Sequence, residues 1–407
     1  MKALKREKRL LRLVYLLCLL LFITLGFLQK PFDTFAVVMG IVLCVLIGYS
    51  HFIIRRFYPD GDKFILIFSS VLAVVGVATL YRINRVTAIK QLVWIAIGMI
   101  SYILIVVILP DLRSFSKYKK IYMIVTLLLM PLALIFGTEQ YGAKNWIIIG
   151  KSISLQPSEF GKIALVLYLA SALATYENKK SFKEEFKELW QPALVAGFSM
   201  GCMVLQRDLG SALIFFGISI TLLYVATSKK KYVFTALGLA AIGSVAGYSM
   251  FGHVRERVMI WLDPWKYALG ESYQIVEGMY SIAAGGLFGV GLGQGHFQNL
   301  PVKESDMIYA IICEEFGIIF AIGLMIIYFL LFYRGIRAAF VTDDKYSQLI
   351  AVGFSTMIAC QTLVIIGGIF AVIPLTGITL PIVSYGGSSV LTIFFALGIL
   401  QKISEEA

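Results

Sequence analysis

Apolar residues occur along most of this chain in long, nearly unbroken runs, and polar segments separate one run from the next. A helix needs roughly 17–25 apolar residues to cross the hydrocarbon core of a membrane. The run at 192–206 is short and lightly polar, so its bounds are the least well defined. The pattern predicts twelve transmembrane helices, at about residues 11–28, 35–54, 64–81, 91–109, 121–137, 159–176, 192–206, 209–227, 232–250, 307–333, 348–373 and 386–402.

Composition agrees with a membrane protein and excludes a soluble globular one. Hydrophobic residues make up 59% of the 407 residues, and the mean hydropathy is +0.85. A net charge of +12 would suggest nucleic-acid binding in a soluble protein, but here the positive-inside rule accounts for it, and we expect no nucleic acid. Most Lys and Arg residues become cytoplasmic if both termini are cytoplasmic, with Arg82, Arg85 and Lys90 as the main exceptions. The loop 251–306 then faces outward.

Polar residues on the outward side are concentrated in four segments, 138–158, Gln206–Asp208, 251–306 and Pro374–Ser389. Loops as long as 251–306 that form no domain of their own are usually functional. If the four segments converge, they build one external cavity. On the cytoplasmic side, segment 177–191 predicts an amphipathic helix on the inner membrane surface, with docking of a partner as the alternative.

The segment 138–158 and the helix after it contribute the first candidate residues. Pro157 suits the first turn of a helix, and Glu159 and Lys162 then form a pair that complements the helix end. The alternative is functional: Trp146 offers an aromatic face, with Lys144 and Lys162 beside an anionic headgroup.

Asp208 lies between two apolar runs, where ionisable groups are costly and are usually paired or functional. It either pairs with Arg207 or caps the helix that begins at Leu209, or it holds a cation or orients a lysine. Both interpretations stay open.

The long loop offers Arg255 and Arg257, followed by a glycine-rich stretch over 285–295. Arg suits a diphosphate because its guanidinium donates paired hydrogen bonds. Asp306 ends the loop, where it either caps the helix at 307–333 or acts as a base. A helix N-terminus would lower its pKa and favour the carboxylate. Glu314 and Glu315, deeper in that helix, are expected to be buried and paired.

The segment Pro374–Ser389 contains two prolines and small polar residues, including Ser384. Irregular backbone is tolerated at membrane depth only where it is buried or lines a cavity. The segment therefore predicts a broken helix that lines the cavity.

In order along the chain, these elements resemble the SEDS family (shape, elongation, division and sporulation), which includes relatives of RodA, FtsW and SpoVE. The resemblance covers about residues 64–402. The matching residues are Asn145-Trp146-Ile147, Gln156-Pro157-Ser158-Glu159 with Lys162, Gln206-x-Asp208-Leu209-Gly210, Trp261-x-Asp263-Pro264, Leu300-Pro301 with Asp306, Glu314-Glu315-x-Gly317 and the run from Pro374 to Ser389.

The resemblance implies an all-α polytopic membrane protein with about ten core helices in residues 61–407. Residues 1–60 then contain two additional helices, which we expect at the periphery as a partner or regulatory surface. The sequence departs from the usual family pattern at Lys144-Asn145, Arg207, Glu277-Gly278 and around Asp306.

The implied activity is a peptidoglycan glycosyltransferase that polymerises lipid II outside the bacterial cytoplasmic membrane with a class B penicillin-binding protein. The family's essential loop aspartate corresponds to Asp306, which would act as the base. Arg255, Arg257, Lys144 or Lys303 would stabilise the leaving diphosphate, and a divalent cation, Mg²⁺ or Mn²⁺, is a possible cofactor. The alternatives are a lipid II flippase, a noncatalytic scaffold for a penicillin-binding protein, or another glycan polymerase or ligase.

Overall fold

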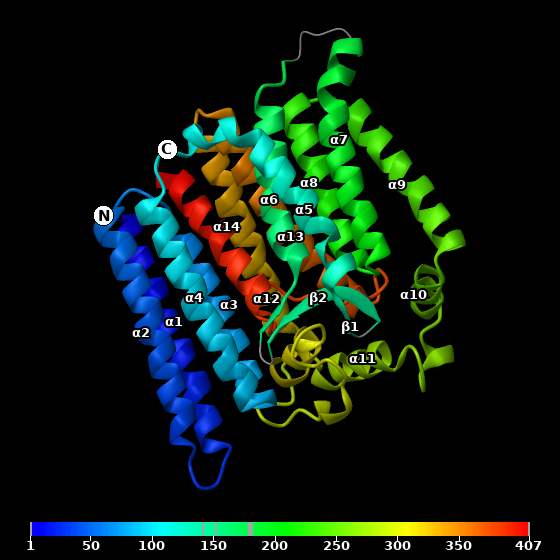
Figure 1. Ribbon diagram of the computed structural model, residues 1–407. Helices are drawn as coiled ribbons and strands as arrows, with labels where there is room; N and C mark the ends of the chain where they lie inside the picture. Colours follow the sequence, from blue (N-terminus) through cyan, green and yellow to red (C-terminus); the bar gives the residue numbers. More distant parts are fainter. Residues whose placement is uncertain (1, 141, 151–152, 178–181, 406–407) are drawn as a thin grey trace.

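A computed structural model of the protein describes all residues except 1, 141, 151–152, 178–181 and 406–407. The chain forms a bundle of long helices whose two termini lie at the same end (Figure 1). The long helices are α1 (Lys2–Phe27), α2 (Thr34–Phe57), α3 (Phe64–Ile83), α4 (Arg85–Ile108), α5 (Lys119–Phe136), α6 (Pro157–Ala174), α7 (Phe182–Leu205), α8 (Leu209–Thr227), α9 (Lys230–Met250), α12 (Ile308–Val341), α13 (Lys345–Ile369) and α14 (Gly387–Glu405).

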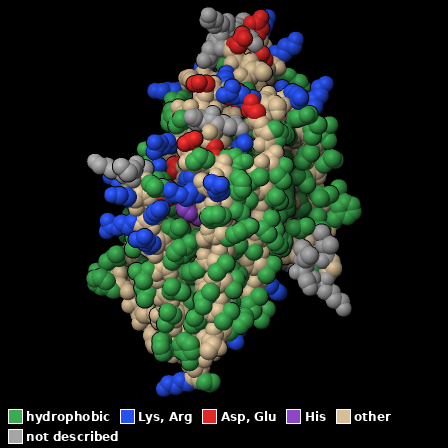
Figure 2. Space-filling model, turned by 90° about the vertical axis from the view of Figure 1, so that its left-hand side faces the viewer, with side chains coloured by type: hydrophobic (Ala, Val, Ile, Leu, Met, Phe, Trp, Pro, Cys, Tyr) green, Lys and Arg blue, Asp and Glu red, His purple; other side chains and the backbone are tan. Residues whose placement is uncertain are grey.

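Every predicted transmembrane run corresponds to one of these helices. Within the described residues, eleven helices are long and apolar enough to cross a membrane, and α7 is the long helix that falls outside this set. Figure 2 shows the face at the left of Figure 1, where apolar side chains cover most of the surface and Lys and Arg gather toward the upper end. The chain is therefore a multi-pass membrane protein.

The helix α7 corrects the prediction of a separate surface helix at 177–191. It runs without a break from Phe182 to Leu205, through Pro192. Residues 178–181 lie outside the described part of the chain. The first turns of α7 are polar and extend beyond the apolar part of the same helix. In these turns Glu185 binds Lys229, Lys231 and Tyr232 at the start of α9.

Helix α3 packs against α1, α4 and α12, is buried on nearly all sides and is correspondingly apolar all round. Helices α1 and α2 form a hairpin at one edge of the bundle, where they pack against α3 and α4 (Figure 1). At the opposite edge stands α9, which contributes no buried residue.

The polar segments at the end of the bundle opposite the termini have more regular structure than the sequence predicts. The loop 251–306 contains α10 (Gly252–Leu262), α11 (Tyr273–Gly285) and the short 3-10 helices η2 (Trp265–Tyr267) and η3 (Phe297–Asn299). The segment before α6 forms an antiparallel sheet of β1 (Thr138–Gln140), β2 (Ala143–Ile149) and β3 (Ile153–Leu155), with β2 in the centre. The short 3-10 helix η1 (Leu112–Tyr118) precedes α5.

Two breaks in helical structure shape this end of the molecule. Between α13 and α14 the chain is non-helical over residues 370–386, which confirms the predicted broken helix. In α12 the backbone turns at Gly317, with φ +82°. There the amides of Ile318 and Ile319 donate to the carbonyls of Gly286 and Leu287, so the glycine-rich loop is fixed to the kink.

Candidate active site

A cavity of about 780 Å³ opens at the end of the bundle opposite the termini. Its walls come from the β1–β3 sheet, the turn before α8, helices α10 and α11, the segment 302–306 and the break 375–387. The four polar segments therefore do converge, and together they build one cavity. A volume of this size lies within the roughly 300–1,000 Å³ typical of ligand sites.

Asp306 lies in this cavity, on a tight turn just before α12. The turn is held on both sides: the Tyr385 amide donates to the Glu304 carbonyl at 2.9 Å, and Ser384 Oγ donates to the Ser305 carbonyl at 2.6 Å. The carboxylate faces the backbone of Gly377, where an added Cβ would lie 3.4 Å from Asp306 Oδ2. The break between α13 and α14 thus positions the catalytic candidate.

The expectation that Asp306 caps α12 with a lowered pKa is wrong. The helix begins at Ile308, its cap position is Met307, and no side chain caps it. Burial raises the pKa of Asp306 to about 6, although a hydrogen bond from Ser305 and the charge of Arg257 oppose the change. The nearby Asp208 carboxylate adds to the rise in pKa. Asp306 is therefore a stronger base than an ordinary surface aspartate.

Arg257 brings a positive charge into the cavity from α10. Its guanidinium donates to the carbonyls of Leu375 and Thr376, at 3.4 and 3.2 Å. Trp261, one turn further along α10, donates from Nε1 to the Ala371 carbonyl at 2.8 Å. These bonds hold α10 against the break, so the Arg257 charge stays close to Asp306.

Asp208 is buried and accepts four hydrogen bonds. Its Oδ1 accepts from the Ser211 amide, which makes it the N-cap of α8. Its Oδ2 accepts from Asn145 Nδ2 at 3.2 Å, Gln156 Nε2 at 3.0 Å and Ser211 Oγ at 2.8 Å. Arg207 bonds to Glu139 at 3.2 Å, so the alternative of an Arg207–Asp208 pair is wrong. Asp208 joins the sheet, the start of α6 and α8.

Glu159 and Lys162 form a buried pair at the inner end of the cavity. Lys162 Nζ donates to Glu159 Oε1 and to Gln361 Oε1, both at 2.8 Å, and its side chain is only 1% exposed. Thr392 donates to Glu159 Oε2 at 3.1 Å. Glu159 lines the cavity, whereas Lys162 lies behind it. The pair connects α6 to α13 and α14.

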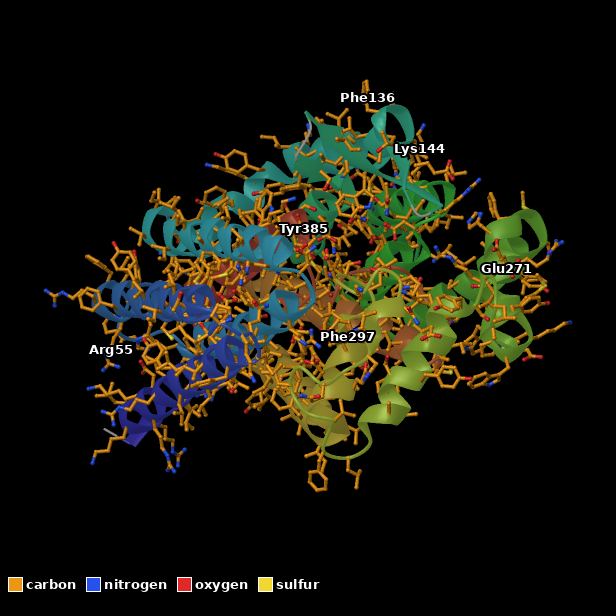
Figure 3. The ribbon with its side chains drawn as sticks, turned by 90° about the horizontal axis from the view of Figure 1, so that it is seen from below. Arg55, Phe136, Lys144, Glu271, Phe297 and Tyr385 are labelled. Carbon is orange, nitrogen blue, oxygen red and sulfur yellow. The ribbon has the colours of Figure 1, made fainter. Side chains whose placement is uncertain are left out.

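The other predicted site residues divide into two groups. Trp146 and Lys303 line the cavity, and Lys303 Nζ lies 5.8 Å from the centre of the Phe297 ring. Lys144, Arg255 and Ser384 do not line it. Lys144 donates to the Leu134 carbonyl, and in the view from below it lies with Phe136 toward the edge of the molecule, whereas Tyr385 lies nearer the centre (Figure 3). Arg255 donates to the Ser249 carbonyl, and Ser384 supports the Asp306 turn from behind.

Several cavity residues were not singled out from the sequence. His253, Glu256 and Ile260 line the cavity together with Arg257, and Glu271 contributes from just before α11. The residues of α10 recur at helical spacing around Arg257, so a helix prediction at 252–262 would have found them. Burial lowers the pKa of His253, and its Nε2 has no hydrogen-bond partner among the residues that the structure describes.

A divalent cation does not fit Asp208 as the side chain is arranged here. Both of its carboxylate oxygens already accept hydrogen bonds from neighbouring side chains and backbone. Among the described residues, no group of three or more His, Cys, Asp or Glu side chains is arranged to hold a metal ion. We therefore derive no chemical step through a metal at this residue.

Comparison with known proteins places this geometry in a family. A family model described as a cell cycle protein of the FtsW, RodA and SpoVE type matches residues 61–407. The chain is a member of the SEDS family. The SEDS match begins after α2, so the α1–α2 hairpin lies outside the matched range.

Most of this SEDS protein aligns with relatives from other organisms. The peptidoglycan glycosyltransferase RodA of Mycobacterium tuberculosis is 35% identical over 395 residues, which is 90% of this chain and 83% of the relative. The stage V sporulation protein E of Bacillus subtilis is 34% identical over 360 residues, 84% of this chain and 96% of the relative.

Solved structures share the fold. A structure described as the structural coordination of polymerization and crosslinking by a peptidoglycan synthase complex contains a chain with a TM-score of 0.72 and 26% identity. The likeness covers 84% of this chain and 97% of that one. The crystal structure of the rod shape determining protein RodA of Thermus thermophilus has a TM-score of 0.63 and 25% identity, over 84% of this chain and 96% of that one.

Proposed function

We propose that this protein is a peptidoglycan glycosyltransferase that polymerises lipid II in the cavity described above. The observation that carries the proposal is Asp306, a carboxylate with a raised pKa that lies deep in a polar cavity beside a fixed arginine. The relatives named peptidoglycan glycosyltransferase RodA support the enzyme class.

In the proposed reaction Asp306 removes the proton from the 4-hydroxyl of the acceptor's N-acetylglucosamine. The hydroxyl oxygen attacks the anomeric carbon of a lipid-diphosphate-linked N-acetylmuramic acid. A new glycosidic C–O bond forms, the bond from that carbon to the phosphate oxygen breaks, and the lipid diphosphate leaves with the electron pair. The proton stays on Asp306 until solvent removes it.

Arg257 and Lys303 stabilise the leaving diphosphate in this proposal. Both line the cavity, and Arg257 is held in place by two backbone carbonyls. Fixed positive charge near a developing anion lowers the barrier because it needs no rearrangement during the reaction. Lys144 and Arg255 do not line the cavity, so we assign them no role in this step.

We further propose that the cavity opens on the outer face of the cytoplasmic membrane and that both termini are cytoplasmic. The support is the distribution of Lys and Arg, which are concentrated at the end of the bundle that carries the termini (Figure 2). We propose a class B penicillin-binding protein as the partner, because a similar chain forms part of a peptidoglycan synthase complex.

We propose a role for a divalent cation only as an ion that the substrate's diphosphate binds. Mg²⁺ commonly binds phosphates together with one or two carboxylates, so the lipid diphosphate would supply most of its ligands. Polymerisation with and without a chelator tests this requirement directly.

The proposed function is tested with the purified full-length protein in liposomes that contain labelled lipid II, alone and with class B penicillin-binding proteins. Wild type is expected to form glycan strands. Asp306→Ala should lose about 10²–10⁴-fold in rate, the usual contribution of a general base.

Glu277→Gln is the matched control. It removes a carboxylate from the same outward segment, and Glu277 does not line the cavity. It should polymerise at close to the wild-type rate. If Asp306→Ala polymerises as fast as wild type, the assignment of the base is wrong. If wild type forms no strands with any partner, the flippase or scaffold alternative replaces the proposed activity.

A further inference from the structure

The α1–α2 hairpin reaches the end of the bundle that carries the cavity. Its connection contains Asp33, whose side chain is almost fully buried although it lies outside both helices. Asp33 Oδ2 accepts a hydrogen bond from Tyr81 Oη at 2.6 Å and a second one from Arg85. A buried carboxylate needs such partners, because burial without them is costly.

The corner between α3 and α4 is therefore attached to the hairpin by Tyr81 and Arg85. Arg85 also lies over the rings of Phe35 and Tyr81, 5.4 and 5.5 Å from their centres. Phe22 of α1 packs edge-on against Tyr81, with 6.2 Å between the ring centres. Polar and aromatic contacts thus act on the same two residues of the corner.

The neighbouring residues of the same corner hold the loop that leads to Asp306. Arg82 donates to the Gly293 carbonyl at 2.9 Å and to Glu315 Oε1 at 3.2 Å, and its guanidinium lies 5.1 Å from the centre of the Phe297 ring. On α4, Thr87 Oγ1 donates to Glu304 Oε2 at 2.9 Å. Glu304 is two residues from Asp306.

The hairpin also contacts this loop directly. Leu28 packs on Gly293, where an added Cβ would lie 2.4 Å from Leu28 Cδ1. The loop is pinned from its other side by α12: Glu315 Oε1 accepts from the amides of Gly293 and Gly295, and Glu314 Oε1 accepts from the His296 amide at 2.6 Å. The hairpin, the α3–α4 corner and α12 therefore enclose the loop 293–304.

We propose that the tip of the α1–α2 hairpin is a positioning element for the catalytic loop and that Asp33 is its central positioning residue. Asp33 fixes Tyr81 and Arg85 at the α3–α4 corner. Arg82 and Thr87 of this corner hold Gly293 and Glu304. The loop that contains Gly293 and Glu304 then determines the position of Asp306. The inference rests on the proposed function for its catalytic consequence, but the structural part, control of the loop 293–306, stands without it.

The test compares the full-length wild type with Asp33→Ala, with Leu28→Ala, and with the charge swap Asp33→Arg/Arg85→Asp. Hydrogen–deuterium exchange reports the amides of Gly293, Gly295 and His296, and lipid II polymerisation gives kcat and KM. We expect Asp33→Ala to speed exchange of these amides at least tenfold and to lower kcat at least tenfold, with KM within about twofold of wild type. Leu28→Ala should change both quantities in the same direction but less.

The charge swap should restore kcat and amide protection to within about threefold of wild type, because the attraction between residues 33 and 85 is retained. The control is Glu7→Gln at the far end of the hairpin, where Glu7 bonds to His51 and Arg55 at 2.8 and 2.9 Å. It alters a buried hairpin contact far from the loop and should leave exchange over 293–306 unchanged.

Wild-type exchange and wild-type kcat in both Asp33→Ala and Leu28→Ala would overturn the proposal. Equal losses in Glu7→Gln would overturn it as well, because they would assign the effect to general hairpin stability. If Asp33→Ala fails to insert, Leu28→Ala and the charge swap give the decision. A wild type that shows no polymerisation contradicts the proposed function alone, because the exchange measurement still decides whether the hairpin controls the loop.

Discussion

At the scale of single residues, the environment of Asp306 decides what its carboxylate does. Deep placement in the protein disfavours the charged form, and the Asp208 charge adds to the effect, while Ser305 and Arg257 oppose it. The resulting pKa of about 6 keeps Asp306 ionised at neutral pH but makes it a better proton acceptor than an aspartate at the ordinary value of 3.8.

This raised pKa predicts how polymerisation depends on pH. Only the ionised carboxylate accepts a proton, so the rate should be constant above about pH 7 and should fall about tenfold for each unit below pH 6. At pH 5 we expect about a tenth of the maximal rate, measured as the initial rate of strand formation at saturating lipid II. A carboxylate with an unshifted pKa would still be almost fully active there.

Arg257→Gln provides the internal check for this profile. Loss of the positive charge removes one influence that lowers the pKa of Asp306, so the fall in rate should begin at a higher pH when each profile is scaled to its own maximum. A wild-type rate that stays constant down to about pH 4.5 would contradict the raised pKa of Asp306.

At the scale of elements, Asp208 shows how a short polar turn organises its neighbours. The turn Gln206–Asp208 contains Arg207 at φ 62°, and its last residue caps α8 while it binds the side chains of Asn145 and Gln156. The carboxylate thereby connects β2 and the residue before α6 to the start of α8, and Asn145, Gln156 and Asp208 all line the cavity.

Removing this carboxylate should destabilise the protein measurably. Loss of an N-cap costs about 0.5–2 kcal/mol, and each buried donor left without a partner costs about 1–3 kcal/mol. We therefore expect Asp208→Ala to lower the free energy of unfolding by about 2–4 kcal/mol, measured by denaturant or thermal unfolding in detergent without added metal.

The neighbouring Arg207→Ala is the matched control, because its ion pair with Glu139 is solvent-exposed and such pairs contribute about 0–1 kcal/mol. Its unfolding should be close to that of wild type. Suppose instead that Asp208→Ala unfolds like wild type and that it polymerises more slowly than wild type only in assays that contain a divalent cation. Asp208 is then a metal ligand, and its role as a cap is secondary.

The elements also show what the sequence can reveal. Runs of apolar residues predicted all of the long helices, because membrane span length fixes the length of such a run. The break between α13 and α14 was predictable from Pro374 and Pro381. Helices α10 and α11 were not, because at 11 and 13 residues they are too short to appear as membrane-spanning apolar runs.

The candidate site shows the same limit. Asp306, Arg257 and Trp146 were identified by residue type and position, and all three line the cavity. Lys144 and Arg255 have equally suitable chemistry but bond to the backbone carbonyls of Leu134 and Ser249. Which way a side chain on a strand or a helix points depends on how that element packs, and this information is spread over the whole chain.

At the scale of the whole molecule, a buried polar network joins the cavity to the centre of the bundle. Lys162 and Glu159 of α6 bond to Gln361 of α13 and to Thr392 of α14. Gln361 in turn donates to the Thr379 carbonyl in the break that forms one wall of the cavity. Hydrogen bonds around one ion pair thus connect α6, α13 and α14 to the part of the cavity wall that contains Thr379.

This arrangement predicts strongly non-additive effects of mutation. Lys162→Met leaves the Glu159 charge buried and unpaired, which should lower the free energy of unfolding by about 3–5 kcal/mol. The double variant Glu159→Gln/Lys162→Met removes both charges and should recover at least half of that loss, since a buried ion pair gains little over neutral groups of similar size.

The measurement is a double-mutant cycle on unfolding in detergent, with polymerisation rates determined for the same four proteins. A folded double variant that polymerises slowly would show that the pair also orders the wall around Thr379. One that polymerises at the wild-type rate would restrict the pair to stability. Additive single and double effects would contradict the coupling, because two groups in direct contact at 2.8 Å cannot be perturbed independently.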